Sequence, residues 1–345
     1  MEKIPVIFFI LTFSLSLSAK NYDFNSLRKE FSPPNDIPFP VENSYSKKKE
    51  SLGLNLFFSR LLDKNKYLSC SGCHNPFRGF ADDFTFSLGS GGNRTTRNSP
   101  SIINLAWSDR FFWDGRVDSL EKQVIFPIES HLELNLKMEE LVQRLKAETE
   151  YVKKFNEVFP QVGITKETIA SALATFVRTL KSHGAPFDKW IKGDANAINE
   201  SAKRGFDLFR GKAKCISCHF GWRFTNDQFA DIGVVGNDIG RGKFDSNFNF
   251  AFKIPGLRKI SETSPYMHNG SLVTLDDVIE FFNRGGDVKR PSVQITPLHL
   301  TSDEKKDLKE FLLTLTDKEI RKEILQELYS AKEIRRKKRN EEFGY

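Results

Sequence analysis

The stretches that decide the fold are Cys70-Ser71-Gly72-Cys73-His74 and Cys215-Ile216-Ser217-Cys218-His219, which contain all four cysteines of the chain. A Cys-x-x-Cys-His motif supplies two thiols that add to the vinyl groups of haem and an adjacent imidazole that binds the iron from one face. A thiol pair for disulfide exchange or zinc binding would not need a histidine at the next position twice. The sequence therefore predicts two covalently attached haem c groups, with iron bound by His74 and His219.

Similar residues precede the two motifs. Gly53-Leu54-Asn55-Leu56-Phe57-Phe58 lies before the first, and Gly205-Phe206-Asp207-Leu208-Phe209 lies before the second. Each stretch is typical of a helix with a Leu-Phe face, so the chain carries a weak internal repeat. Two long irregular segments, 75–112 and 220–265, follow the motifs. They are longer than ordinary connections, and we expect them to be functional.

Helical periodicity is clear in 137–158, 165–181 and 301–316, whereas strand signals are sparse. A chain of 345 residues is long enough for two modest domains with separate cores. We therefore predict a mainly α fold of two cytochrome c-like domains with long irregular loops. The first spans 45–190 and the second spans 195–320.

The first 19 residues have the form of a secretory signal peptide. A lone lysine precedes an apolar run that ends in small residues, and the run is shorter than the roughly 20 residues needed to cross a bilayer. We therefore expect residues 1–19 to be removed, no membrane span to remain, and the mature protein to reside in the periplasm. Residues 20–44 contain several prolines and no helical period, so we predict an extended N-terminal arm laid over the protein.

Residues 321–345 are predicted to form a basic helical tail. Ile320, Ile324, Leu325 and Leu328 continue a helical pattern into the basic run 335–339, and the chain carries a net charge of +7. Basic runs can bind nucleic acid, but a basic run that continues a helical pattern is more typical of a helix exposed to solvent. The alternative is that this helix docks to an acidic partner. We expect no nucleic-acid partner.

Three further motifs resemble those of the bacterial dihaem cytochrome c peroxidase and MauG family. With both haem motifs in order, the resemblance covers roughly residues 50–316. It implies an N-terminal haem where hydrogen peroxide reacts, a C-terminal haem that receives electrons, and a tryptophan between them, which matches Trp113. The motifs are Arg97-Asn98-Ser99-Pro100, Phe112-Trp113-Asp114-Gly115-Arg116 and Pro265-Tyr266-Met267-His268-Asn269-Gly270.

The resemblance also implies the residues that assist peroxide cleavage. Glu133 matches the family's catalytic glutamate, a carboxylate that moves a proton between the peroxide oxygens, and Gln123 matches a glutamine of the same pocket. We interpret Asp114 and Arg116 as structural. The family's calcium ion, bound between the haems by oxygen ligands, would fall at Asn98, Thr263 and Pro265.

Two positions depart from the family pattern. Many of these peroxidases carry a capping histidine sixteen residues after the first haem histidine, and Ser90 stands there by gap-free count. We therefore predict that the N-terminal haem is open in the fully oxidised protein. A Met or Tyr iron ligand is expected fourteen residues after His268, where this chain has Phe282. We expect an atypical or absent sixth ligand at the C-terminal haem, or a shifted loop.

The sequence thus predicts a periplasmic dihaem peroxidase that takes electrons from a small c-type cytochrome or cupredoxin. One alternative is a MauG-like oxidase that uses peroxide to modify a partner protein, which the loss of the capping histidine at Ser90 favours. Another is an electron carrier or haem sensor without turnover, which Phe282 leaves open. By analogy with the family we also expect a homodimer.

Overall fold

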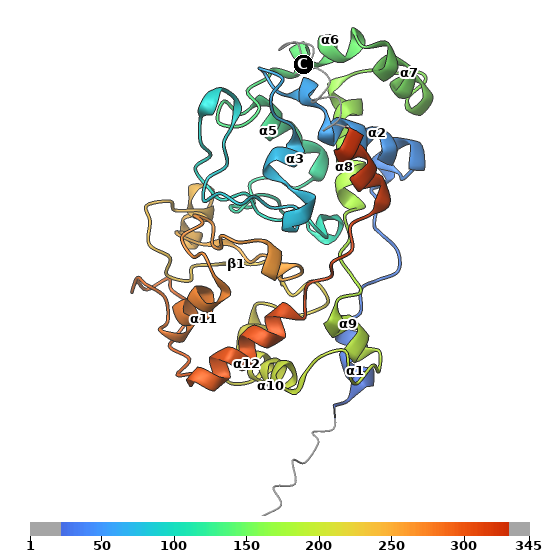
Figure 1. The fold of residues 1–345 in the computed structure, drawn as a ribbon. Helices are drawn as coiled ribbons and strands as arrows, with labels where there is room; N and C mark the ends of the chain where they lie inside the picture. Colours follow the sequence, from blue (N-terminus) through green and yellow to red (C-terminus); the bar gives the residue numbers. More distant parts are fainter. Residues whose placement is uncertain (1–21, 331–345) are drawn as a thin grey trace, which may run out of the picture.

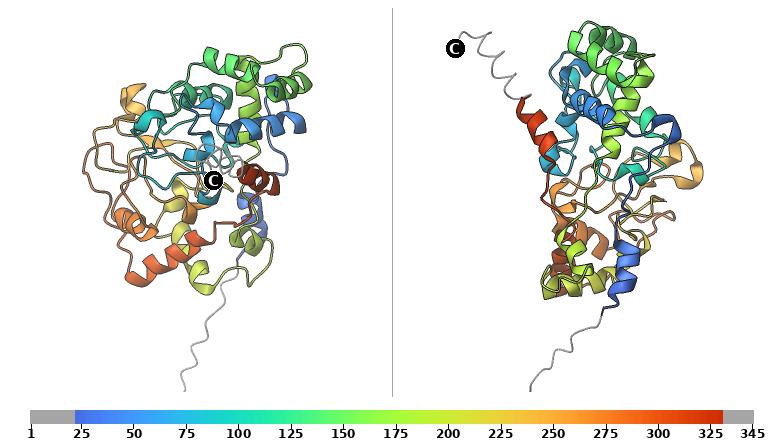
Figure 2. Two further views of the ribbon diagram at one scale, coloured as in Figure 1. Left: turned by 45° about the horizontal axis from the view of Figure 1, so that its top comes forward. Right: turned by 90° about the vertical axis from the view of Figure 1, so that its right-hand side faces the viewer.

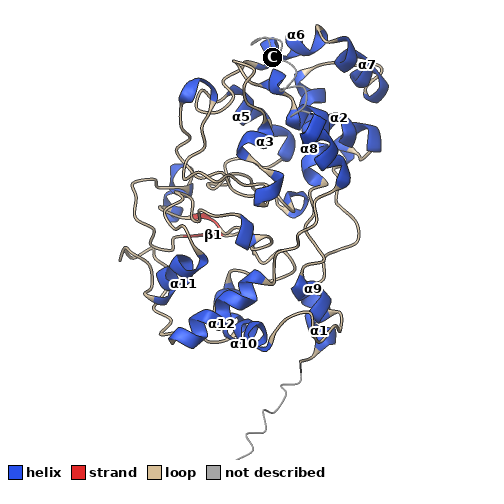
Figure 3. Cartoon of the chain, in the orientation of Figure 1, coloured by secondary structure: helices blue, strands red, loops and turns tan. Residues whose placement is uncertain are grey.

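The computed structural model describes residues 22–330, and these are mainly helical, as expected (Figure 3). The signal peptide predicted at 1–19 and residues 331–345 of the basic tail lie outside them. Within residues 22–330, one short sheet pairs β1 (Phe229–Ala230) with antiparallel β2 (Phe252–Lys253). The α-helices are α1 Phe24–Phe31, α2 Lys47–Phe58, α3 Cys70–Cys73, α4 Leu120–Gln123, α5 Ile125–Glu129, α6 Met138–Lys146, α7 Thr149–Val158, α8 Lys166–Arg178, α9 Pro186–Ile191, α10 Glu200–Arg210, α11 Leu275–Asn283 and α12 Ser302–Leu313.

The molecule has two halves, each built on a packed pair of helices (Figure 1). In the first half α2 packs against α8, and in the second α10 packs against α12. A first core gathers buried side chains such as Leu56, Leu141 and Phe176. A second core is rich in aromatic rings, among them Phe206 and Phe311.

A glycine lies at each of these helix crossings. A Cβ atom added at Gly53 in α2 would lie 2.0 Å from the carbonyl oxygen of Ala172 in α8. One added at Gly205 in α10 would lie 1.9 Å from the carbonyl oxygen of Asp307 in α12. The internal repeat therefore has a structural cause: in both halves, the helix before the haem motif touches the backbone of its partner.

The segment predicted as an extended arm contains a helix, so that expectation was wrong for residues 24–31. Asp23 caps α1 by accepting hydrogen bonds from the N–H groups of Asn25 and Ser26. Leu27 and Phe31 lie four residues apart on one face and are buried in the second core. The periodicity was missed because only two residues carry it.

The other end of the chain packs on the first half. Residues 322–330 are helical, and Ile324 is buried in the first core. Arg321 pairs with Glu50 of α2 at 2.6 Å. Figures 1 and 2 show this segment beside the first half, while α1 lies beside α9 in the second. The two ends of the described chain therefore cross. The N-terminal helix α1 packs in the second half, and the C-terminal residues 322–330 pack on the first half.

One other segment was predicted as continuous. The periodic segment 137–158 forms two helices, α6 and α7, because residues 147–148 break the helix between them.

The irregular segments 75–112 and 220–265 hold only short turns and the small sheet, as expected. They meet at the seam between the halves, where the hydroxyl of Ser108 donates to Asp227. None of the helices within residues 22–330 has the length and apolar character needed to cross a membrane.

Candidate haem and peroxide site

The two haem histidines are held in the same way. The Nδ1 atom of His74 lies 3.0 Å from the carbonyl oxygen of Phe80, and that of His219 lies 2.8 Å from the carbonyl oxygen of Phe224. Such a contact fixes the ring and leaves Nε2 for a metal. Burial lowers the pKa of both imidazoles, which favours the neutral form that binds iron.

The cysteines of each motif lie on one turn that ends at the histidine. The N–H of His74 donates to the carbonyl of Cys70, and that of His219 donates to the carbonyl of Cys215. All four cysteines, including Cys73 and Cys218, are free thiols in half-buried positions. The residues present therefore fit a covalently bound haem at each motif.

Trp113 joins the two halves. Its indole N–H donates to the carbonyl oxygen of Asn98 at 2.8 Å. Its own carbonyl oxygen accepts the backbone N–H of Lys253, in strand β2 of the second half, at 2.7 Å. Trp113 thus lies at the seam.

Glu133 lies beside the first haem motif. Burial raises the pKa of the Cys70 and Cys73 thiols to about 12, and the nearby charge of Glu133 contributes in the same direction. Burial also raises the pKa of Glu133 above its ordinary value, and the charge of Arg116 opposes that shift. A carboxyl group in such a setting can exchange a proton closer to neutral pH than an exposed one can.

The loop of Ser90 touches the loop of Glu133. The N–H of Ser90 donates to the carbonyl oxygen of Glu133, and a Cβ atom added at Gly89 would lie 2.0 Å from the carbonyl oxygen of Leu132. The Ser90 hydroxyl is buried and accepts a hydrogen bond from the Asn65 amide at 3.0 Å. The residue in the place of the capping histidine is therefore engaged with the protein.

Arg116 has a role that sequence reasoning missed. Its guanidinium lies 3.6 Å from the centre of the Phe112 ring and 2.9 Å from both carboxylate oxygens of Asp114. This fixed charge acts on Glu133, seventeen residues further along the chain. No spacing rule links the two positions, because irregular backbone separates them.

The other predicted residues are placed as follows. Gln123 is half-buried at the end of α4. Asn98 is buried and donates its backbone N–H to the carbonyl of His268, in the loop that also holds Thr263 and Pro265. The described residues contain no group of three or more His, Cys, Asp or Glu side chains suited to a metal ion, so calcium here would rely on amide and backbone oxygens.

Phe282 lies in the last turn of α11, edge-on to Phe281 with ring centres 5.4 Å apart. Fourteen residues before Phe282, the ring of His268 stacks on that of Phe252 with ring centres 3.5 Å apart. Burial lowers the pKa of His268 to about 4. A phenyl ring carries no atom that ligates iron, so an atypical or absent sixth ligand at the C-terminal haem, or a shifted loop, stays a prediction.

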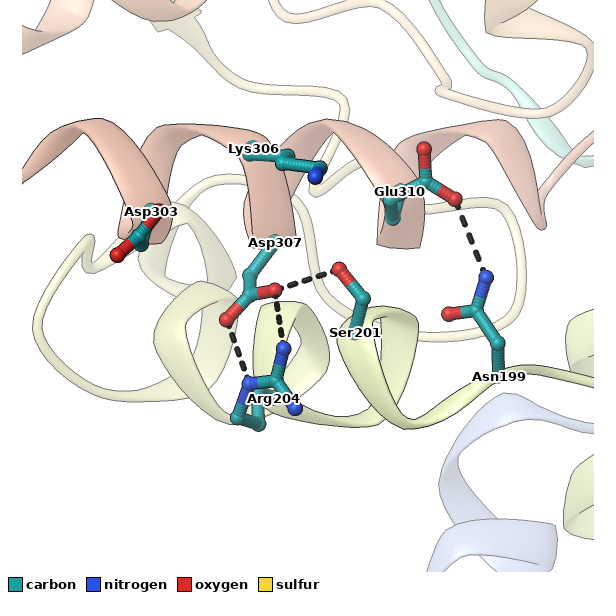
Figure 4. Close-up of a pocket in the computed structure, with 7 residues that line it drawn as sticks. All are labelled: Asn199, Ser201, Arg204, Asp303, Lys306, Asp307 and Glu310. Carbon is teal, nitrogen blue, oxygen red and sulfur yellow. Dashed lines mark hydrogen bonds and ion pairs between the residues drawn. The ribbon is translucent and has the colours of Figure 1, made fainter.

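A separate groove lies between α10 and α12 (Figure 4). There Asp307 binds Arg204 through two hydrogen bonds of 2.7 and 2.8 Å and accepts a third from Ser201. None of the predicted site residues lines it. The groove is an ion-paired surface that braces the helix pair.

A family model described as di-haem cytochrome c peroxidase matches residues 47–196. The methylamine utilization protein MauG of Methylorubrum extorquens is 43% identical over 305 residues, which cover 86% of this chain and 86% of that protein. The chain belongs to the di-haem cytochrome c peroxidase family. This confirms the resemblance stated above and identifies the protein as a peroxidase-type oxidoreductase with haem c cofactors.

Other relatives of the family agree. The cytochrome c551 peroxidase of Nitrosomonas europaea is 33% identical over 273 residues, covering 77% of this chain and 79% of that one. The crystal structure of a MauG-like protein associated with microbial copper homeostasis aligns with a TM-score of 0.76 at 32% identity. The alignment covers 87% of this chain and 96% of that structure, so the peroxidase fold extends over both halves.

Replacing Arg116 in this peroxidase should shift its pH dependence. If Glu133 is the proton acceptor that the resemblance implies, it acts only as a carboxylate, so the peroxide reaction should weaken as pH falls through the pKa of Glu133. Arg116→Gln removes a charge that lowers this pKa, so the acid limb of the second-order rate constant should move to higher pH. Arg110→Gln, which removes an exposed charge near Asp118, is the control. An acid limb that stays in place in Arg116→Gln would contradict this assignment.

Proposed function

We propose that this chain is a periplasmic dihaem peroxidase that reduces hydrogen peroxide with electrons from a small c-type cytochrome or cupredoxin. The observation that carries the proposal is the presence of two groups together: the half-buried carboxyl of Glu133 beside the first haem motif, and Trp113 where the two halves meet. Haem bound at His74 would supply the iron that binds peroxide. Haem bound at His219 would take in electrons.

The protein's own residues would transfer the proton at the peroxide and carry electrons between the two haem sites. Glu133 would take a proton from the inner peroxide oxygen and return it to the outer one, which a carboxyl with a raised pKa does well near neutral pH. Gln123 would line the same pocket. Trp113, bonded to both halves through its indole and its carbonyl group, would carry electrons between them.

The two cores support cytochrome c-like domains at about 45–190 and 195–320, each with its own helix crossing. The crossed chain ends would complete these domains. Asn98, Thr263 and Pro265 are the proposed calcium ligands, and the hydrogen bond from Asn98 to His268 keeps their loops together. A periplasmic location would follow from the signal-like residues 1–19.

A MauG-like oxidase that modifies a partner protein is the second candidate. It is favoured by Ser90 in place of the capping histidine and by the 43% identity to a MauG protein. Phe282 argues against a faithful copy, because it lacks the phenolic oxygen of the tyrosine found there in MauG-like members. An electron carrier without turnover is less favoured because Glu133, Gln123 and Trp113 are all retained.

We expect the fully oxidised protein to show a high-spin signal from the N-terminal haem in electron paramagnetic resonance. No histidine stands at position 90 to cap the iron, so peroxide should react without prior reduction in stopped-flow absorption. Low-spin signals from both haems, with no peroxide reaction, would contradict this. Turnover with reduced cytochrome c then supports a peroxidase, whereas a peroxide-dependent change in a co-expressed partner supports the oxidase.

A further inference from the structure

Arg97 forms an ion pair between the two halves. Its Nε and one terminal nitrogen bind both carboxylate oxygens of Asp238, in the second half, at 2.6 and 3.0 Å. Its other terminal nitrogen binds Asp114, in the first half, at 2.6 Å. The side chains of Arg97, Asp114 and Asp238 are 13%, 4% and 25% exposed, so water screens the Arg97–Asp114 contact little and the Arg97–Asp238 contact more.

The same short segment holds Trp113 by a second route. Asn98, the neighbour of Arg97, accepts the indole N–H of Trp113, while Arg97 holds the carboxylate of Asp114, the residue after Trp113. Residues 97–98 thus bind residues 113–114 at two points, the indole of Trp113 and the carboxylate of Asp114. Arg97 is therefore next in sequence to the residue that accepts the indole N–H, and it binds the residue that follows Trp113.

From Asp114 the network continues toward the peroxide pocket. Both oxygens of Asp114 also bind Arg116, whose charge lowers the pKa of Glu133. On the far side, Asp238 also accepts the N–H of Gly240 at 3.0 Å, which anchors it in its own loop. A carboxylate of the second half therefore lies at one end of a chain of contacts that runs through Arg97 and Asp114, the neighbour of Trp113, to Arg116.

We propose that Asp238 and Arg97 are positioning residues that hold Trp113 in the geometry for electron transfer between the haems. This inference rests on the proposed function of Trp113 as the bridge. The step makes and breaks no covalent bond: one electron leaves one iron and reduces the other. A bidentate Arg-carboxylate pair suits this role because its fork geometry fixes both distance and angle.

The test is pulse radiolysis of the holoprotein, in which one injected electron redistributes between the two haems and is followed by their absorption. Asp238→Asn keeps the size of the side chain and removes its charge, so redistribution should slow by about tenfold or more, because Arg97 loses its carboxylate partner in the second half and keeps only Asp114. Asp238→Glu should recover most of the rate. Asp118→Asn, which breaks the exposed pair with Lys122, is the matched control and should behave as wild type.

Redistribution at the wild-type rate in Asp238→Asn would overturn the proposal. A role limited to stability would lower the melting temperature of Asp238→Asn and leave the electron rate unchanged, which also overturns it. If Asp238→Asn does not fold, Arg97→Lys serves instead, since it keeps the charge but loses the fork, and it should slow redistribution while leaving the spectra of both haems intact. Because the measurement uses no peroxide, failure of the peroxidase function would appear separately, as a wild-type protein that exchanges electrons but does not react with peroxide.

Discussion

Glu133→Gln should lower the second-order rate constant of the oxidised protein with hydrogen peroxide by a factor of about 10² to 10⁴, the usual contribution of a general acid-base group. Glutamine keeps the shape of the side chain but cannot accept and return a proton. Stopped-flow absorption of the purified dihaem protein measures the rate directly. The haem spectra before mixing should be unchanged, because Glu133 is not an iron ligand.

Glu129→Gln is the matched control. Glu129 lies four residues earlier, at the end of α5, and its carboxylate accepts the N–H of Met138. The amide oxygen of glutamine can accept the same hydrogen bond, so this variant should react at the wild-type rate. Equal rates for Glu133→Gln and wild type would remove Glu133 from the mechanism and leave the electron-carrier reading as the better one.

Gly53→Ala should destabilise the protein by about 3 kcal/mol, the upper part of the usual range for overpacking a core. The added methyl group would lie 2.0 Å from the carbonyl oxygen of Ala172 and 2.8 Å from the Cβ atom of Phe176, so α2 and α8 must move apart. For a chain of 345 residues, thermal unfolding followed by circular dichroism should show a melting temperature lower by roughly 4–5 °C.

Ser51→Ala, two residues earlier on an exposed position of the same helix, separates packing from helix propensity. Alanine is the better helix former, so this variant should be as stable as wild type or slightly more stable. Gly205→Ala should repeat the loss in the second half, where the added methyl group meets the carbonyl oxygen of Asp307 at 1.9 Å. A Gly53→Ala protein as stable as Ser51→Ala would show that α2 and α8 can separate at little cost.

Much of the site could be predicted from the sequence because its chemistry lies in short contiguous stretches. Two thiols and an imidazole must lie on one turn to hold a haem, so the local spacing of the motif is enough to identify His74 and His219. The roles of Glu133, Gln123 and Trp113 came from resemblance to a family rather than from spacing. The comparisons confirm the family, and the roles remain to be tested.

Helices with several apolar residues at regular spacing, such as α8 and α12, were predicted for a local reason as well. Helix α1 was not, because Leu27 and Phe31 are its only buried residues and their value depends on a core built by distant segments. The break between α6 and α7 was missed for a related reason, since periodicity continues on both sides of it.

The amino-acid sequence by itself determined the two haem motifs and the mainly helical fold, because neighbouring residues produce each of these. Only the tertiary structure decided that the chain ends cross, that Arg116 acts on Glu133, and that Arg97 meets Asp238. The last two partners are 141 residues apart. Such contacts depend on how irregular segments fold over the seam, where no 3.6-residue or two-residue period constrains which side chains meet.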